Sequence, residues 1–198
     1  VANPGCFATA ITLALAPLAS AGLVKDDVHV HAITGSTGAG KGLSASSHFS
    51  YRDNNISIYK PFTHQHLGEI RQTMEVLSGG ASPVINFVPL RGDFPRGILA
   101  SLYTKVSKKV SVESVRELYE SAYAKSPFVH LSAGTVSLKE VVNTNKALVQ
   151  VERHGENIHI TSIIDNLLKG ASGQAVQNMN LMLGIKEDTA LRLKGQAF

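Results

Sequence analysis

Cys6 is the only cysteine in this chain of 198 residues, and it follows Asn3, Pro4 and Gly5 directly. Pro and Gly favour a tight turn, and the apolar run over residues 7–21 predicts a helix. Free N–H groups and the positive dipole at a helix N-terminus lower the pKa of a thiol, and a thiolate is a nucleophile. We therefore predict a reactive Cys6 with a lowered pKa. The alternative is a small buried apolar side chain.

A second group of residues that could take part in catalysis lies at the start of a helix predicted over residues 64–78. His66 and Glu69 are three residues apart and so share one face of that helix. Near neutral pH a histidine can take a proton from a thiol and return one to an alkoxide. We predict that His66 is the acid/base partner of Cys6, with His64 as the alternative. A metal site would require His64 to lie before the helix begins, and we expect none.

A glycine-rich segment, residues 35–42, follows a strand predicted over residues 28–34. In a P-loop a Ser or Thr follows the lysine and binds magnesium, but here Gly42 occupies that position. Glycines still let backbone N–H groups converge on an anion, and Lys41 adds positive charge. The segment therefore predicts an anion-binding loop, with a flexible connector as the alternative.

The remaining pattern favours strands over helices in the middle of the chain. Apolar and polar residues alternate in several segments, and Ser111 is placed to cap a helix. Further strands are predicted over residues 84–90, 97–106, 147–153 and 157–164, and further helices over 111–125 and 167–183. Because strands and helices do not alternate regularly, we predict an α+β fold, with a mixed or antiparallel sheet and helices on one face.

The composition restricts the classes of partner. The net charge of +4 suits a small molecule that carries phosphate, and the basic residues are not interleaved with aromatic ones as in nucleic-acid binding. No apolar run is long enough to span a bilayer, so we expect no membrane partner. A single cysteine fits a reducing compartment, which predicts a cytoplasmic protein.

Four segments resemble, in the same order, the N-acyl-gamma-glutamyl-phosphate reductases, which are arginine-biosynthesis relatives of aspartate-semialdehyde dehydrogenase. The segments are residues 1–17, 36–41, 64–70 and 170–180. Two positions differ from the usual motif, because Gln65 replaces an arginine and Gly68 replaces a proline. Both residues flank the histidines without replacing them.

The resemblance implies NADPH-dependent reduction of N-acetyl-gamma-glutamyl phosphate to the semialdehyde plus phosphate, through a thioacyl intermediate on Cys6. It implies that Arg96, which precedes Gly97, binds the substrate carboxylate, the alternative being a salt bridge to Asp93. The substrate-binding residues implied are His64, Glu69, Arg96, Ser36 and Lys41. The cofactor-binding residues implied, on a C-terminal helix, are Gly173, Gln174 and Asn178.

The resemblance also implies a domain organisation. Residues 1–198 would form one catalytic and dimerisation domain, like the C-terminal domain of glyceraldehyde-3-phosphate dehydrogenase. No Gly-x-Gly-x-x-Gly motif is present, so we expect the nucleotide-binding Rossmann domain to be absent from this chain. Residues 1–22 and 168–198 would pack on that missing domain, in a homo-oligomer that is a dimer or a tetramer.

Several alternatives stay open. The acyl group could be succinyl, or the substrate could be that of an aspartate-semialdehyde dehydrogenase or a lysine-pathway reductase. The chain by itself could be an inactive dimerisation and substrate-binding module. A thiol-dependent acyltransferase or hydrolase would use Cys6 and His66 without nicotinamide.

Overall fold

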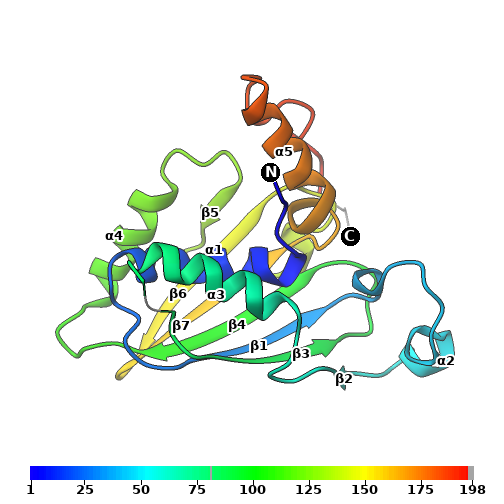
Figure 1. Ribbon diagram of the computed structural model, residues 1–198, viewed down its shortest axis with the longest axis horizontal. Coiled ribbons are helices and arrows are strands. Elements are labelled where there is room, and N and C mark those ends of the chain that lie inside the picture. Colours follow the sequence, from blue (N-terminus) through cyan, green and yellow to red (C-terminus); the bar gives the residue numbers. More distant parts are fainter. Residues whose placement is uncertain (81, 196–198) are drawn as a thin grey trace.

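A mixed sheet of seven strands, in the order β2-β3-β1-β4-β7-β6-β5, forms the centre of the computed structural model, which describes residues 1–80 and 82–195 (Figure 1). β1 pairs in parallel with β3, β5 pairs in parallel with β6, and the other pairs are antiparallel. The strands are β1 (Val28–Thr34), β2 (Ser57–Ile58), β3 (Ile85–Arg91), β4 (Ile98–Lys105), β5 (Val129–Leu131), β6 (Ala147–His154) and β7 (Asn157–Ile164). The predicted α+β class is confirmed.

Helices α1 (Cys6–Ser20), α3 (His66–Leu77) and α4 (Val112–Tyr123) lie on one face of this sheet (Figure 1). α1 is the central one, and it contacts β4, β6 and β7 below it and α3 and α4 beside it. Apolar residues lie around most of its circumference, as expected of a helix that is buried on several sides. The helix that begins with the cysteine is therefore the best-anchored helix of the fold.

Pro17 lies inside α1 and has no N–H group to donate to the Leu13 carbonyl one turn earlier. The Tyr123 hydroxyl of α4 donates to that carbonyl instead, at 2.6 Å, and the Tyr119 hydroxyl donates to the Ala14 carbonyl. α4 thus satisfies the carbonyl that the proline leaves without a partner, and this locks the two helices together.

The C-terminal helix stands apart from the other helices. A π-helical turn, η4 (Leu168–Ser172), follows β7 and continues into α5 (Gly173–Met182), which projects from the sheet beside the N-terminus (Figure 1). The helix predicted over residues 167–183 is present, but its first turn is π-helical. Among the described residues, no helix combines the length and the apolar character needed to cross a membrane.

Residues 35–61, for which the sequence pattern predicts neither a helix nor a strand, form several short elements. These are the 3-10 turns η1 (Ser36–Ala39) and η2 (Ala45–Ser47), the short helix α2 (Phe49–Arg52) and the edge strand β2. β5 and a further 3-10 turn, η3 (Leu138–Glu140), were also not predicted. Elements of two to four residues hold too few positions for a periodic pattern to be recognised.

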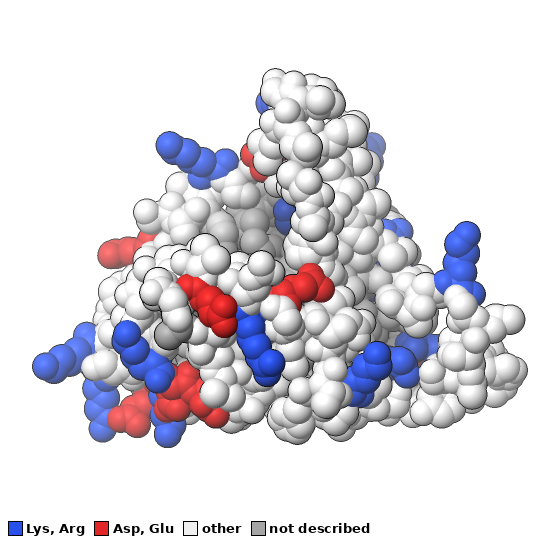
Figure 2. Space-filling model, in the orientation of Figure 1, with Lys and Arg blue, Asp and Glu red and all other residues white. Residues whose placement is uncertain are grey.

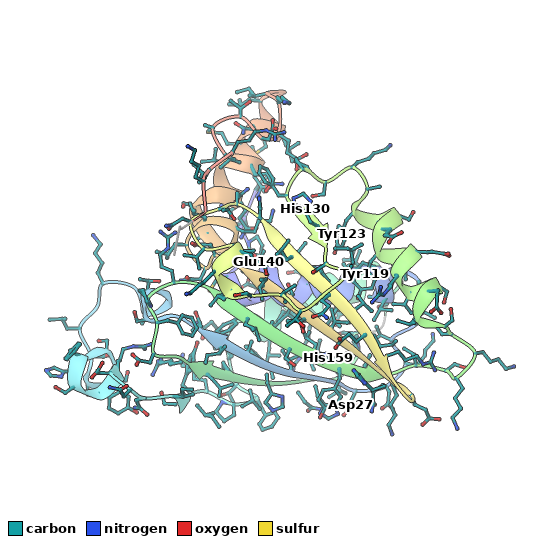
Figure 3. The ribbon with its side chains drawn as sticks, turned by 180° about the vertical axis from the view of Figure 1, so that it is seen from behind. Asp27, Tyr119, Tyr123, His130, Glu140 and His159 are labelled. Carbon is teal, nitrogen blue, oxygen red and sulfur yellow. The ribbon has the colours of Figure 1, made fainter. Side chains whose placement is uncertain are left out.

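The other face of the sheet carries no α-helix among the described residues. In the view from behind, the strands lie in front of α1, and His159 lies on them (Figure 3). The Ser101 hydroxyl and His159 Nε2 are 2.8 Å apart, and His159 Nδ1 lies 3.5 Å from Glu152 Oε2. We call this surface the open sheet face.

Candidate active site

Cys6 is the first residue of α1, and the preceding turn is tied to α3. The Gly5 N–H donates to Glu69 Oε2 at 2.7 Å, a contact between residues 64 positions apart. Glu69 thus supplies the acceptor that the N-terminus of α1 needs, since no side chain of its own turn caps that helix. Glu69, a predicted substrate contact, does not line the cavity described below, and its carboxylate instead contacts the Gly5 N–H and the His66 ring.

Two glycines make room on the two sides of Cys6. A Cβ atom on Gly5 would lie 2.1 Å from His66 Nε2, so the imidazole packs directly on the glycine backbone. A Cβ atom on Gly170 would lie 2.7 Å from the Cβ atom of Cys6. A larger residue at either position would displace a neighbour. Cys6 therefore lies between His66, at the start of α3, on one side and Gly170 of η4 on the other.

The two histidines form a buried pair with a distinct role for each. His64 lies before α3, its ring centroid is 4.6 Å from that of His66, and its Nδ1 atom accepts a hydrogen bond from the His66 N–H at 3.2 Å. Phe7, Tyr59 and Phe87 surround the His64 ring. Burial, helped by the neighbouring His66 and Lys60, lowers the pKa of His64 to about 4. His64 is thus a neutral, packed support for His66.

His66 is the histidine that is placed for proton transfer. Burial lowers the pKa of His66, and Glu69, whose Oε1 lies 4.0 Å from Nε2, opposes that shift. The ring is therefore neutral near pH 7 and able to accept a proton. Its buried Nδ1 atom has no hydrogen-bond partner within the described part of the chain. Although His64 does precede the helix, the described residues contain no cluster of three or more ligands able to hold a metal.

The predicted lowered pKa of Cys6 is wrong for this structure. Burial raises the pKa of the Cys6 thiol, and the charge of Glu69 adds to that effect. The backbone N–H groups of Phe7 and Cys6 act in the opposite direction, as expected at a helix N-terminus, but burial outweighs them. Cys6 therefore needs a base at the moment it attacks, and the neutral His66 beside it can serve.

Cys6, His64 and His66 open into a cavity of about 890 Å³ that also contains Ser36, one of the predicted substrate contacts. Its positive charges are those of Arg52, Lys60 and Arg91, and no Asp or Glu lines it among the described residues. Lys41 is exposed and does not line it. The lysine that lines this cavity is Lys60, which was not among the predicted contacts.

The glycine-rich loop also differs from the prediction. The N–H groups of Ser36, Thr37, Gly38 and Gly40 donate to backbone carbonyls of residues 94, 95, 35 and 37. They are used to fold η1 against the strand ends, so they do not converge on an anion as predicted. Asn166 holds the same loop, since its side chain donates to Thr37 Oγ1 at 3.0 Å and accepts from the Gly97 N–H at 2.7 Å.

The structure does not bring Arg96 to the cavity. Its guanidinium forms an ion pair with the fully buried Asp165 at 3.0 Å and donates to Asn143 Oδ1 at 2.7 Å. A buried carboxylate requires such a partner, and Asp165 also accepts from the N–H groups of Leu167 and Leu168. Arg96 thus stabilises the turn from β7 into η4. The alternative, a salt bridge to Asp93, is not formed.

The three predicted cofactor contacts do not line the cavity either. Gly173 packs against Asn145, the Gln174 amide donates to the Pro4 carbonyl and to Thr9 Oγ1, and the Asn178 amide donates to Asn3 Oδ1. These contacts join α5 to the turn before Cys6. The cavity wall on this side is made by Gly170, Ala171, Ser172 and Ala175.

The sequence offered no signal for Arg52, Tyr59 and Arg91. Arg52 and Tyr59 lie in the segment without periodic pattern, and Arg91 ends a strand. They meet because β2 pairs with β3 in the antiparallel sense, with Ser57 opposite Arg91. That pairing depends on a strand of two residues, which is too short to be predicted from a pattern in the sequence.

Comparison with known proteins gives three findings. Residues 6–166 match a family model described as semialdehyde dehydrogenase, dimerisation domain. Over its full 198 residues the chain is 55% identical to a protein of Phocaeicola vulgatus and 57% identical to one of Bacteroides thetaiotaomicron, both named N-acetyl-gamma-glutamyl-phosphate reductase. The chain spans 61% of the length of these two relatives.

Solved structures with a similar fold are aspartate semialdehyde dehydrogenases. For enzyme II of Vibrio cholerae the TM-score is 0.70 at 17% identity, over 93% of this chain and 62% of that one. For the enzyme of Francisella tularensis the TM-score is 0.69 at 14% identity, over 91% and 64% of the two chains. The α+β architecture is therefore shared with them.

Proposed function

This chain belongs to the semialdehyde dehydrogenase dimerisation-domain family, and we propose that it is the catalytic part of an NADPH-dependent reductase that converts N-acetyl-gamma-glutamyl phosphate to N-acetylglutamate semialdehyde and phosphate. The observation that carries the proposal is the packing of His66 on Gly5 beside Cys6, supported by Glu69, at a basic cavity. A nucleophile, a neutral base and positive charge are what attack on an acyl phosphate requires.

In the first half-reaction the Cys6 sulfur attacks the acyl carbon. His66 takes the thiol proton, a C–S bond forms, and the C–O bond to phosphate breaks, which leaves a thioacyl group on Cys6 and free phosphate. The N–H groups of Cys6 and Phe7 at the start of α1 stabilise the thiolate as it forms. Phosphate leaves far more readily than the hydroxide of a free acid, which favours the acyl phosphate as substrate.

In the second half-reaction the thioacyl carbon is reduced. NADPH supplies the two electrons as a hydride, which no side chain can provide. The protonated His66 gives its proton to the resulting alkoxide on Cys6. As the C–S bond breaks, His66 takes the hydroxyl proton back and passes it to the sulfur, which releases the aldehyde and regenerates the thiol.

The residues beside Cys6 fit a flat nicotinamide ring. The cavity wall at η4 is built from Gly170, Ala171, Ser172 and Ala175, and a side chain on Gly170 would collide with Cys6. Small residues of this kind let a ring approach the thioacyl carbon closely. The part of NADPH beyond the nicotinamide would be held by a nucleotide-binding domain outside this chain.

Exposed apolar residues on and after α5 support contact with that further domain. Met179, Leu181, Met182, Leu183 and Ile185 are between 42% and 66% exposed. α5 also contacts Asn3, so this surface and the N-terminus are adjacent. We propose that residues 1–5 and 168–195 pack on the nucleotide-binding domain and that the isolated chain is inactive without it, whereas α1 is already buried against the sheet, α3 and α4. Residues 196–198 of the predicted segment lie outside the described residues.

The open sheet face is the proposed surface for self-association. It combines the stacked rings of His29 and Tyr103, 4.9 Å apart, with the Ser101, His159 and Glu152 network. No α-helix of the described residues covers this face, so its side chains are only half-buried. The family description names a dimerisation domain, which agrees with such a surface. In Figure 2 acidic side chains lie among the basic ones on the left and at the centre, whereas on the right, around α2 and β2, basic side chains are seen without acidic ones. We propose a homo-oligomeric, cytoplasmic enzyme.

The test uses the full-length protein that carries this chain. We expect NADP⁺ reduction by N-acetylglutamate semialdehyde to require phosphate and to vanish in Cys6→Ser, and His66→Asn to lower turnover far more than His64→Asn. Phosphate-independent acyl release without NADPH would favour a thiol hydrolase instead. Activity that survives in Cys6→Ser would overturn the mechanism.

A further inference from the structure

We propose that Arg52, Tyr59 and Arg91 form an anion-binding subsite that holds a carboxylate of the substrate while its acyl carbon lies at Cys6. The proposal rests on the proposed function, since it assumes that a substrate occupies this cavity. All three side chains line the cavity. They take the role that the sequence assigned to Arg96, whose guanidinium is instead committed to the buried Asp165.

The pairing of β2 with β3 brings the three side chains together. Arg91 at the end of β3 lies opposite Ser57 of β2, and Tyr59 follows β2 with its N–H donating to the Pro89 carbonyl. The Cζ atom of Arg91 lies 4.1 Å from the centroid of the Tyr59 ring. This stacking fixes the plane of the guanidinium and leaves its N–H edge available.

Arg52 is anchored next to the same strand end. Its Nη2 atom donates to the Gly92 carbonyl at 2.6 Å, so the guanidinium lies beside the residue that follows Arg91. That contact uses one of the five N–H donors of Arg52. One guanidinium held by the Gly92 carbonyl and a second stacked on the Tyr59 ring form a preorganised site for an anion.

The donors of this subsite lack protein partners. Across residues 1–80 and 82–195, Arg91 has no hydrogen bond or ion pair through its guanidinium, and the Tyr59 hydroxyl has no hydrogen bond. The nearest acidic side chains along the chain, Asp53 and Asp93, accept hydrogen bonds from Asn54. A guanidinium in a cavity without a carboxylate partner favours binding of an anion from solution.

Tyr59 connects the subsite to the reacting centre. Burial and the nearby Cys6 raise the pKa of Tyr59 to about 12, and Arg91 and Arg52 oppose that shift. The phenol therefore lies within reach of the thiol's charge and of both guanidinium groups, and it stays a hydrogen-bond donor at neutral pH. The Tyr59 ring stacks with Arg91 on one side and lies 5.6 Å from the His64 ring, which is in turn 4.6 Å from the His66 ring, so the phenol lies between Arg91 and the histidines beside Cys6. This suits a carboxylate several bonds from the acyl carbon better than the phosphate bonded to that carbon.

Two carboxylates of the proposed substrate class fit this description. One is the α-carboxylate of the glutamyl unit, and the other is the terminal carboxylate of a succinyl group on its nitrogen. The chemistry of recognition is the same for both, and the choice between them depends on which end of the substrate faces β2.

Isothermal titration of the full-length protein tests the subsite without requiring turnover. The ligands are N-acetylglutamate, N-succinylglutamate and inorganic phosphate, each titrated into wild type, R52Q, R91Q and the control R71Q. Arg71 lies on α3, is exposed and does not line the cavity. We expect R52Q and R91Q to weaken binding of a carboxylate ligand roughly tenfold to a hundredfold, the loss typical of a charge-assisted hydrogen bond, and R71Q to bind as wild type does.

Each outcome decides the proposal. Equal weakening for both N-acylglutamates supports it and assigns the bound carboxylate to the glutamyl unit, whereas weakening for N-succinylglutamate alone supports it and identifies the acyl-terminal carboxylate. Unchanged binding of both ligands to R52Q and R91Q overturns it, and so does a loss confined to inorganic phosphate. Absent turnover together with arginine-dependent carboxylate binding would overturn the proposed function and leave the subsite standing.

Discussion

The backbone N–H of Gly5 donates to Glu69 Oε2 at 2.7 Å, and this single hydrogen bond joins the turn that holds Cys6 to the helix that begins with His66. Nucleophile and base are thereby held in one unit, although 60 residues of sequence separate them. The same carboxylate has its other oxygen 4.0 Å from His66 Nε2. Glu69 therefore acts on both reacting groups without entering the cavity.

Two substitutions of Glu69 distinguish the effect of its hydrogen bond with the Gly5 N–H from the effect of its negative charge. Glu69→Gln keeps an acceptor for the Gly5 N–H, whereas Glu69→Ala leaves that donor unpaired. We expect Glu69→Ala to destabilise the fold by about 1–2 kcal/mol in urea unfolding and to lower kcat/KM at least tenfold, with a smaller stability loss in Glu69→Gln. Equal stability of the two variants would show that the hydrogen bond does not hold the turn.

Gly5→Ala tests the packing of His66 on the glycine. The new methyl group would lie 2.1 Å from His66 Nε2, so the imidazole must move away from Cys6, and we expect kcat to fall at least a hundredfold. Gly68→Ala is the matched control, because Gly68 lies exposed in α3 and its Cβ would have nothing within 4 Å. That variant should keep full activity and gain roughly 0.5–1 kcal/mol of stability. Similar activity losses in both variants would contradict the packing argument.

The thiol of Cys6 should titrate at a higher pH than a free cysteine. Because burial raises its pKa, the thiolate fraction at a given pH is smaller in the folded protein than in the unfolded one. Iodoacetamide labelling at a series of pH values should give a midpoint near about 8.5 in urea and a higher midpoint in native protein. A native midpoint below the unfolded one would restore the prediction made from the helix N-terminus alone.

Stability should depend on pH through His64. Its pKa of about 4 in the folded state lies below the value of about 6.5 expected when unfolded, so protonation favours unfolding. The contribution of neutral His64 is fully present above about pH 6.5 and is lost as the pH falls toward 4. We expect urea unfolding to show a decline on the order of 2 kcal/mol over this range, and His64→Gln to reduce it. An unchanged pH dependence in that variant would assign the decline to other groups.

A double-variant cycle tests the link between α1 and α4. Tyr123→Phe removes the hydroxyl that donates to the Leu13 carbonyl, and we expect a loss of roughly 1–2 kcal/mol. In a Pro17→Ala background the new N–H can take that carbonyl, so Tyr123→Phe should destabilise less. Urea unfolding of the four proteins measures the coupling. Additive effects would mean that the proline and the tyrosine do not share this acceptor.

The long elements of the fold could be predicted from the sequence alone, and so could the proximity of Cys6 and His66, which we propose as the reacting pair. The strands at residues 28–34 and 157–164 carry an alternation that reads directly as a half-buried strand, and Ser111 caps α4 as predicted. Cys6 and His66 could be named because each stands at the start of a helix, where local pattern is most informative. These features depend on residues that are near neighbours in the chain.

Only the tertiary structure decided the surroundings of that pair. Burial raises the pKa of Cys6 against the local effect of its helix, because desolvation depends on everything packed around the sulfur. Arg96 is used by the buried Asp165 of a distant strand end, while a strand of two residues brings Arg91 and Tyr59 to the cavity. The sequence could determine which residues have reactive chemistry. Contacts between residues far apart in the chain decide which of these residues face the cavity. The energies of such contacts cannot be derived from a local sequence pattern.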